Sequence, residues 1–299
     1  MLGCLVGQAV GDALGLGAEF LSKEKAASYY PNGLQDYSQI IQDGYRLNWK
    51  QGEYTDDTEM AVCIMQSVIE CGKPDVKNIA FKFWEWFKNQ PRDYGRTTRK
   101  VLTNLNYLKD PFKVSEDYFN LSNSAANGAL MRNAPVAFLP LSYAKDICRL
   151  THWNPLCVDS CIIHSLMIKS LIKREYLPIE DFIDETENEE VKVYLRRGYH
   201  SLESLELDDR ATSGYTLKAL GTAVWAYYHA EDFKSGLESI ILEGGDADTN
   251  GAIAGAVLGA RFGYEAIPEN LKKNLFDEGY ISLCEEYLKC VKQNNLLSI

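Results

Sequence analysis

Two apolar segments of this chain carry glycine at every fourth position. The glycines are Gly3, Gly7, Gly11 and Gly15 near the start, and Gly251, Gly255 and Gly259 near the end. A glycine inside a helix costs about 1 kcal/mol relative to alanine, so seven of them need a structural reason. Glycines spaced by four lie on one face of a helix and let another backbone come close. We therefore predict that both segments are tightly packed helices at the centre of the fold.

Apolar residues elsewhere recur with the period of an α-helix. Such stripes cover residues 2–13, 61–69, 79–87, 220–228, 233–241, 253–258 and 281–291. Asn154 followed by Pro155 predicts one more helix, with asparagine as the N-cap and proline in the first turn. No run of alternating residues predicts a strand, and the acidic residues 183–190 indicate a solvated face or loop rather than a linker. The sequence predicts an all-α fold in a single domain, residues 1–299.

The overall charge and the cysteines exclude several classes of protein. A net charge of −11 argues against nucleic acid as the main partner. The eight cysteines form no C-x-x-C pair and only four histidines are present, so a structural zinc site is not expected. Reduced thiols indicate a cytoplasmic location. The first residues lack a basic region and include Asp12, unlike a signal peptide, and no uncharged apolar run of about 18 residues predicts a membrane partner.

Two adjacent aspartates precede the stripe at residues 61–69, in the sequence GEYTDDTEM (52–60). Helix capping explains part of this pattern, because Thr55 or Asp56 is a good N-cap and Glu59 would complete a capping box at the third helical position. One cap and one acid in the first turn would satisfy such a helix. The remaining side-chain oxygens of this motif exceed what capping needs, so a metal site is the second interpretation beside helix capping.

A second cluster of the same composition, EGGDADTNG (243–251), precedes the glycine-bearing segment near the end of the chain. A glycine C-cap and an aspartate N-cap account for only one of its two aspartates. Two helix N-termini of this kind that meet would offer four carboxylates and two hydroxyls. Oxygen ligands favour Mg²⁺, Mn²⁺ or Ca²⁺ over zinc, and four carboxylates suit two ions that share one aspartate. Glu19 is a possible additional acidic ligand.

Seven motifs resemble those of the ADP-ribosylglycohydrolases, in particular the group typified by the dinitrogenase reductase-activating glycohydrolase. They are GDALGLGAEF (11–20), EYTDDTEM (53–60), RDYGRTTR (92–99), NGALMRNAP (127–135), THWNP (151–155), SGYTLKAL (213–220) and GGDADTNGAIAG (244–255). They occur in the family's order across nearly the whole chain, and the ordered set is far more specific than any one motif. The resemblance implies an orthogonal all-α bundle with a cleft and a dinuclear Mg²⁺ or Mn²⁺ centre at its base.

The resemblance also assigns roles to individual residues. It implies that the metal ligands are Thr55, Asp56, Asp57, Asp246, Asp248 and Thr249, with Asp248 as the bridging carboxylate. Glu19 matches a glutamate that contacts the scissile ribose or the attacking water, so the expected catalytic residues are Glu19, Asp56, Asp57 and Asp248. The expected substrate-binding residues are Asp93, Asn127, Gly128, Met131, His152, Ser213, Gly214 and Tyr215.

Within that set the resemblance distinguishes parts of the substrate. Asn127, Gly128 and Met131 match a loop that holds the diphosphate through backbone N–H groups. His152 matches a histidine beside the phosphates, and Tyr215 an aromatic residue near the adenosine. Relatives often have glycine where this chain has Ala126, so a slightly different path of the loop is expected there.

Two buried-looking basic residues near these motifs have simpler interpretations. Apolar neighbours predict that His164 lies in the core. For Arg132 two roles are possible from the sequence: an interior salt-bridge partner or a phosphate ligand.

The implied reaction is metal-dependent hydrolysis of the bond between ADP-ribose and a modified protein or small molecule, with ADP-ribose as product. Nucleic acid enters only as a modified substrate. Asp93 matches the aspartate with which arginine-specific relatives pair the substrate guanidinium, which predicts a preference for arginine-linked ADP-ribose. In the alternative, Asp93 only caps the helix or turn after Pro91, or pairs with Arg92, Arg96 or Arg99. The alternative activity is hydrolysis of O-linked, as to serine, or nucleobase-linked ADP-ribose.

Two other classes of protein need to be weighed against a glycohydrolase. A non-catalytic ADP-ribose-binding or structural relative is a further alternative, although all six ligand positions are present. An isoprenoid synthase is not favoured, because its DDxxD motif needs an acid where this chain has Met60.

Overall fold

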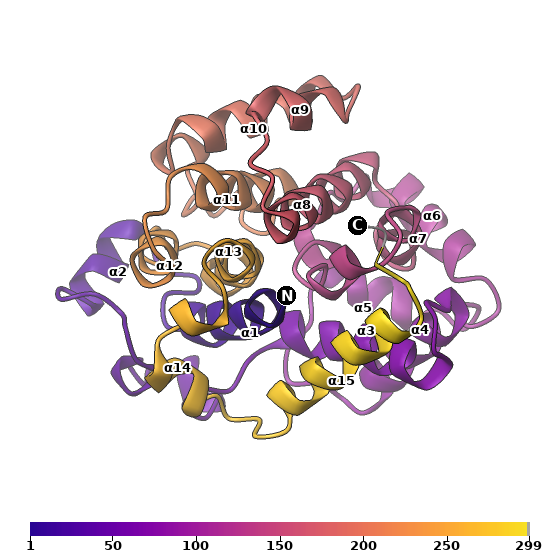
Figure 1. The fold of residues 1–299 in the computed structure, drawn as a ribbon, viewed down its shortest axis with the longest axis horizontal. Coiled ribbons are helices and arrows are strands. Elements are labelled where there is room, and N and C mark those ends of the chain that lie inside the picture. The colour runs from indigo at the N-terminus through magenta and orange to yellow at the C-terminus, as the bar shows by residue number, and fades with distance from the viewer. Residues whose placement is uncertain (298–299) are drawn as a thin grey trace.

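A computed structural model describes residues 1–297 (Figure 1). Within this range the chain forms fifteen α-helices, six short 3-10 turns and no β-strand, so the predicted all-α class is confirmed. The helices are α1 (Leu2–Gly15), α2 (Lys23–Tyr29), α3 (Asp56–Cys71), α4 (Val76–Lys88), α5 (Arg96–Leu102), α6 (Pro111–Ser122), α7 (Ser142–Arg149), α8 (Pro155–Lys173), α9 (Ile179–Asp184), α10 (Glu189–His200), α11 (Thr216–Tyr228), α12 (Phe233–Ile241), α13 (Ala247–Phe262), α14 (Glu269–Lys273) and α15 (Tyr280–Gln293).

The two glycine-bearing helices, α1 and α13, lie against each other at the centre of the molecule (Figure 1). A Cβ atom on Gly7 would lie 2.2 Å from the carbonyl oxygen of Gly255, and one on Gly11 would lie 1.9 Å from that of Gly251. Since real Cβ atoms do not come this close to backbone, only glycine fits these positions. The tight central packing predicted from the glycine spacing is confirmed.

The remaining helices form layers around this pair (Figure 1). On one side α8, α11 and α12 pack on α13, with α10 on the outer face of α11 and α9 against α10. On the other side α3 and α15 pack on α1 and on each other, and α4 packs on α3. Buried side chains from nearly all of these helices form one continuous hydrophobic core.

The caps of α8 and α3 test two of the sequence predictions. The side chain of Asn154 accepts a hydrogen bond from the Leu156 N–H and Pro155 is the first helical residue, as predicted. The N-cap of α3 is Thr55, which places Thr58 at the third helical position. The predicted capping box through Glu59 is therefore wrong, and the Glu59 carboxylate instead accepts a hydrogen bond from Trp86 Nε1 at 2.7 Å.

Helix α8 is, within residues 1–297, the one helix long and apolar enough to cross a membrane by length and composition, with a mean hydropathy of 1.4. It packs against α7, α11 and α13, and 61% of its most apolar window is buried. This is the environment of a core helix, because its apolar surface is covered by other helices of the same chain.

Candidate active site

The first acidic cluster is fixed in place by Asp12, a buried residue of α1. One oxygen of its carboxylate accepts hydrogen bonds from the backbone N–H and the hydroxyl of Thr55, at 3.0 and 2.9 Å. The other oxygen accepts from the N–H and the hydroxyl of Thr58, at 3.0 and 2.6 Å. Asp12 thus binds N–H groups that α3 cannot use internally, and it orients Asp56 and Asp57 between them.

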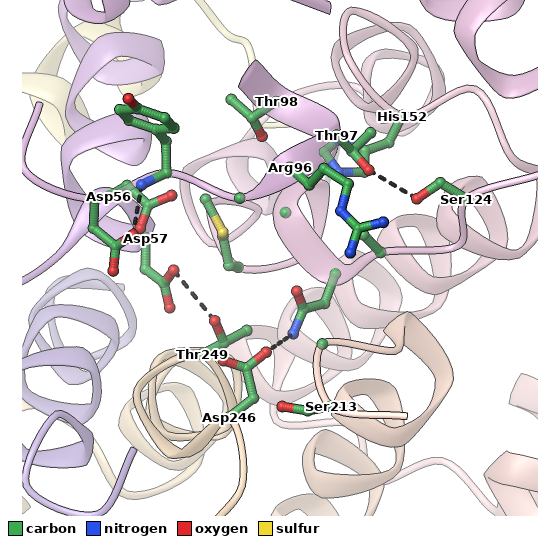
Figure 2. Close-up of a pocket in the computed structure, with 18 of the residues that line it drawn as sticks. Asp56, Asp57, Arg96, Thr97, Thr98, Ser124, His152, Ser213, Asp246 and Thr249 are labelled. Carbon is green, nitrogen blue, oxygen red and sulfur yellow. Dashed lines mark hydrogen bonds between the residues drawn. The ribbon is translucent and has the colours of Figure 1, made fainter. Parts of the chain in front are cut away.

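The second acidic cluster is held by backbone packing instead. A Cβ atom on Gly15 would lie 2.3 Å from the carbonyl oxygen of Ala247, so the end of α1 touches the first turn of α13. Asp246 occupies the N-cap position of α13, but within the described residues 1–297 its side chain makes no capping bond. It accepts a hydrogen bond from Asn127 Nδ2 at 2.7 Å (Figure 2). Capping therefore does not explain this aspartate.

The glycines of the EGGDADTNG motif also do not serve as the C-cap that the sequence suggested. Helix α12 ends at Ile241 with Leu242 as its right-handed C-cap, and Gly244 and Gly245 follow in the loop with φ of 74° and 68°. Glycine is suited to such positive φ values.

The N-termini of α3 and α13 meet, as the sequence predicted. Thr249 Oγ1 lies 3.3 Å from Asp57 Oδ1, and Figure 2 shows Asp56 and Asp57 facing Asp246 and Thr249. One carboxylate oxygen from each of Asp12, Asp57 and Asp248 falls within a 4.8 Å group. Oxygens of Glu19, Asp246 and Asp248 form a second such group, so Asp248 is common to both.

Burial makes negative charge on these carboxylates costly. It raises the pKa values of Asp56, Asp57 and Asp248 well above their usual range, and repulsion among the acids adds to the effect. Asp57 Oδ2 and Asp248 Oδ1 are buried without a hydrogen-bond partner in residues 1–297. Buried carboxylate oxygens without a hydrogen-bond partner are suited to binding divalent cations, which would supply both the missing contacts and the opposite charge.

A cavity of about 500 Å³ opens above the acidic cluster. Most of the predicted site residues line it, namely Glu19, Asp56, Asp57, Asp93, Asn127, Gly128, Met131, His152, Ser213, Gly214, Asp246, Asp248 and Thr249. Two predicted residues lie off this wall. Thr55 lines an adjoining cavity of about 250 Å³, and the Tyr215 hydroxyl donates to Glu190 at 2.6 Å.

The loop at residues 126–131 follows a path that alanine can adopt. Ala126 has an extended backbone, with φ −75° and ψ 154°, and it pairs with Tyr215 in an isolated β-bridge. The Asn127 N–H donates to the carbonyl of Gly214 at 2.9 Å, which ties this loop to residues 213–214 on the cavity wall. Since φ at Ala126 is negative, glycine is not required there.

The chain as a whole matches one family. Residues 1–295 match the family model described as ADP-ribosylglycohydrolase. The chain belongs to the ADP-ribosylglycohydrolase family. It is 32% identical over 274 residues to the ADP-ribosyl-[dinitrogen reductase] glycohydrolase of Rhodospirillum rubrum. The alignment covers 89% of this chain and 87% of that protein.

Another relative and a solved structure agree with this assignment. The chain is 29% identical over 302 residues to the ADP-ribosylarginine hydrolase Tri1 of Serratia proteamaculans, with 96% of this chain and 78% of the relative covered. A solved structure titled ADP-ribosylglycohydrolase-related protein complex matches with a TM-score of 0.79 at 24% identity, over 98% of this chain and 97% of that one. At this level of identity, the similarity to the solved structure shows a shared fold. Family membership supports an ADP-ribosyl glycohydrolase activity.

Two basic residues of this chain differ in how well the sequence predicted them. His164 is buried, as expected, between Asn133 and the carbonyl oxygen of Ile253. Arg132 is fully buried, but it forms no salt bridge within residues 1–297 and does not line the described cavity. Both interpretations of Arg132 were therefore wrong, and its shortest hydrogen bond is to the Thr151 hydroxyl at 2.6 Å.

Tyr45 is a site residue that the sequence did not reveal. Its hydroxyl lies 2.8 Å from Glu19 Oε2 and 3.4 Å from Asp93 Oδ2, so it stands between two of the predicted residues. Its ring packs between Phe20 and Trp49, with centroids 5.4 and 5.1 Å away. No periodic pattern marks this loop, whereas Asp12 had a signal, because it is a charged residue inside an apolar, glycine-bearing helix.

Proposed function

We propose that this chain is a metal-dependent hydrolase that cleaves the glycosidic bond at the distal ribose of an ADP-ribosylated target, with a preference for arginine-linked ADP-ribose. The observation that carries this proposal is the set of buried carboxylates at the floor of the cavity, two of which have an oxygen without a partner in residues 1–297. Buried anions without cationic partners are costly, so their presence at a cavity floor needs a function.

The donor set fits two Mg²⁺ or Mn²⁺ ions held by Thr55, Asp56, Asp57, Asp246, Asp248 and Thr249. All are oxygen donors, which these hard cations prefer. When bound, such ions supply Lewis acidity, which lowers the pKa of a water and orients the hydroxyls of the substrate ribose.

Glu19 is the residue we assign to proton transfer. It is 3% exposed, and burial together with repulsion from Asp246 raises its pKa well above the usual range, which suits a base that works near neutral pH. In the proposed step its carboxylate takes a proton from water. The water oxygen bonds to the anomeric carbon, the bond to the target breaks, and the proton can pass to the leaving nitrogen.

Asp93 supports the preference for arginine. One of its oxygens accepts from the Tyr94 N–H at 2.7 Å and the other lies 3.4 Å from the Tyr45 hydroxyl, while the neighbouring Arg92 forms an ion pair with Glu53. Asp93 has no ion-pair partner among residues 1–297 and lines the cavity, so its carboxylate is available to a guanidinium group. Two parallel N–H···O bonds suit a planar cation and would do little for a serine hydroxyl. The similarity to an ADP-ribosylarginine hydrolase points in the same direction.

The test compares arginine-, serine- and nucleobase-linked ADP-ribose as substrates, each with Mg²⁺, with Mn²⁺ and with EDTA. We expect the arginine linkage to be cleaved fastest and EDTA to abolish turnover. Glu19→Gln and Asp248→Asn should each remove hydrolysis, with ADP-ribose binding largely spared in Glu19→Gln. Asp117→Asn, the same change on an exposed face of α6, is the matched control and should leave the rates unchanged.

Three outcomes would contradict parts of this proposal. Near-normal turnover by Asp248→Asn would remove the dinuclear model. Faster cleavage of the serine or nucleobase linkage, or an Asp93→Ala variant as active on arginine as the parent, would remove the arginine preference. Binding of ADP-ribose without any turnover would leave a non-catalytic binder. A cytoplasmic location stays a prediction, supported by eight cysteines that are all free thiols.

A further inference from the structure

Arg132 is a buried cation that has no anionic partner among residues 1–297. Its side chain is completely buried, its guanidinium lies 4.3 Å from the centroid of the Phe83 ring, and one nitrogen lies 3.4 Å from Met60 Sδ. The remaining close contact joins Nη2 to Thr151 Oγ1 at 2.6 Å. Burying a guanidinium group without an anion beside it is energetically costly. A residue kept at that cost needs a purpose that packing does not supply.

The contact with Thr151 has a fixed direction. A guanidinium group only donates hydrogen bonds, so Thr151 Oγ1 is the acceptor. The second neighbour of this oxygen is Nδ1 of His152, at 2.8 Å. Among residues 1–297 the hydroxyl proton of Thr151 has no other acceptor within hydrogen-bond distance, so it is satisfied only when it is donated to Nδ1. Nδ1 is then an acceptor, and a neutral His152 ring carries its proton on Nε2.

The surroundings keep the ring neutral. Burial, and then the positive charge of Arg132, hold the pKa of His152 well below its usual range. A second proton on Nδ1 would also remove the acceptor that the Thr151 hydroxyl uses. Electrostatics and hydrogen bonding therefore favour the same single protonation state.

The protonated edge of the ring faces the loop expected to hold the diphosphate. A Cβ atom on Gly128 would lie 2.9 Å from His152 Cε1 and 3.0 Å from Nε2, so that edge rests against the Gly128 backbone. His152 and Gly128 both line the cavity. The arrangement thus presents an N–H donor beside the backbone of this loop.

We propose that Arg132 and Thr151 are positioning residues that fix His152 as a neutral imidazole with its proton on Nε2, offered as a donor to the diphosphate of ADP-ribose. The choice of ligand rests on the proposed function, whereas the hydrogen-bond chain does not. A fixed tautomer matters because the other one would present a lone pair to phosphate oxygens, which also only accept.

The test begins with the full-length wild-type chain and nitrogen NMR of its histidines. His152→Asn identifies the His152 signals among the four histidines. We expect an unprotonated Nδ1 and a protonated Nε2 at neutral pH. Thr151→Val should abolish this fixed state and weaken ADP-ribose binding, measured by calorimetry, about tenfold, the effect of losing one hydrogen bond to a charged group.

Two matched variants separate this role from a structural one. Thr151→Ser keeps the hydroxyl and should restore both the nitrogen signals and the affinity. Thr222→Val makes the same change at a buried threonine of α11, whose hydroxyl donates to the Ala219 carbonyl of its own helix, and should alter neither.

Each part of the inference can be overturned separately. A wild-type His152 that is protonated on Nδ1, or on both nitrogens, would overturn the hydrogen-bond chain, and this measurement does not depend on a variant that folds. Unchanged affinity and unchanged signals in Thr151→Val would overturn the positioning role. A wild-type chain with the expected tautomer that does not bind ADP-ribose would overturn the ligand, and with it the proposed function.

Discussion

Helix α1 meets the N-termini of two other helices, and it holds them in different ways. Against α13 the contact is backbone on backbone, with glycine at each close approach. Against α3 the contact is polar: the buried carboxylate of Asp12 accepts four hydrogen bonds, and Gln8 Nε2 donates one to the Asp57 carbonyl. The first contact is steric and does not change with solution conditions. The second depends on the Asp12 carboxylate, which can take up a proton. The acidic cluster at the start of α3 should therefore respond to pH, whereas the packing of the cluster at the start of α13 should respond to substitution of the glycines.

The glycine contact should show the largest effect. A Cβ atom at Gly255 would lie 2.2 Å from the carbonyl oxygen of Gly7, and this atom belongs to backbone that cannot move aside. We expect Gly255→Leu, and likewise Gly7→Leu, to lower the free energy of unfolding by at least about 3 kcal/mol, the upper range for overpacked cores. Thermal and denaturant unfolding would measure this.

The matched control for this substitution is Gly44→Leu. A Cβ atom at Gly44 would meet no atom of residues 1–297 within 4 Å, and the residue is exposed. This variant should melt close to the parent. If Gly7→Leu and Gly255→Leu also melted like the parent, the close approach of α1 and α13 would not be what stabilises the centre of the fold.

Removal of divalent ions should have the next largest effect on stability, because the ions would bind the carboxylates at the N-termini of both α3 and α13. Saturating a site at 100 times its Kd stabilises the folded state by about 2.7 kcal/mol, so EDTA should lower the Tm. Mg²⁺ or Mn²⁺ should then restore it in proportion to the logarithm of the concentration. An EDTA-treated sample that melts like the ion-loaded one would mean that the carboxylates hold no ion.

The metal-free protein should also show a pH dependence of defined sign. Burial raises the pKa of Asp12 to about 7, from about 3.9 in an unfolded chain. A group with a raised folded pKa contributes stability below the unfolded pKa and loses it as pH rises through the folded value. The Tm of the EDTA-treated protein should therefore fall between about pH 4 and pH 8. Mg²⁺ should oppose this fall, since it binds the deprotonated acids.

Asp12→Asn breaks the hydrogen-bonded contact while leaving the glycine contact intact. The amide has one oxygen, so it can satisfy the N–H of Thr55 or that of Thr58 but not both. One buried N–H is then left without an acceptor, which costs about 1–3 kcal/mol. We expect a loss of stability in this range, measured by denaturant unfolding, together with weaker binding of Mg²⁺.

An exposed cap provides the control for this change. Asp110 accepts from the Lys113 N–H at the start of α6, and asparagine is an equally good N-cap. Asp110→Asn should be neutral. An Asp12→Asn protein as stable as the parent, with the same Mg²⁺ affinity, would show that α3 does not depend on this carboxylate.

The comparison also explains which features the sequence could predict. Glycine spacing identified the α1 and α13 contact because both its cause and its partner residues are periodic. The aspartate pairs were recognisable because each precedes an apolar stripe. By contrast, the partner of Asp12 is 43 residues away at Thr55, and nothing in local sequence indicates which loop a buried carboxylate will meet.

The errors have the same origin. The capping rules that predicted a box at Glu59 are local, whereas Glu59 is held by Trp86 on the next helix. Arg132 was expected to have an anionic partner, because unpaired buried cations are rare. Its actual contacts, Thr151 and the Phe83 ring, come from two other segments. Local pattern therefore predicted the elements and the ligands, while tertiary packing decided how the site residues are held.

A third kind of contact holds Glu19, just beyond the end of α1, through the neutral hydroxyl of Tyr45. Tyr45→Phe removes this contact and should have the smallest effect on stability. Phenylalanine keeps the packing against Phe20 and Trp49, so the free energy of unfolding should fall by about 1 kcal/mol or less. Tyr176→Phe, which loses a similar 2.8 Å hydrogen bond to the Tyr227 carbonyl, is the control for stability.

The activity of Tyr45→Phe gives the sharper test of that hydroxyl. Burial and the charge of Asp246 raise the pKa of Glu19, and the Tyr45 hydrogen bond lowers it. Without the hydroxyl the Glu19 pKa rises further, and since Glu19 must be ionised to accept a proton, the acidic limb of the kcat profile should move to higher pH. At a pH on that limb we expect about tenfold lower kcat with little change in KM. A limb that stays in place would show that the hydroxyl does not act through Glu19.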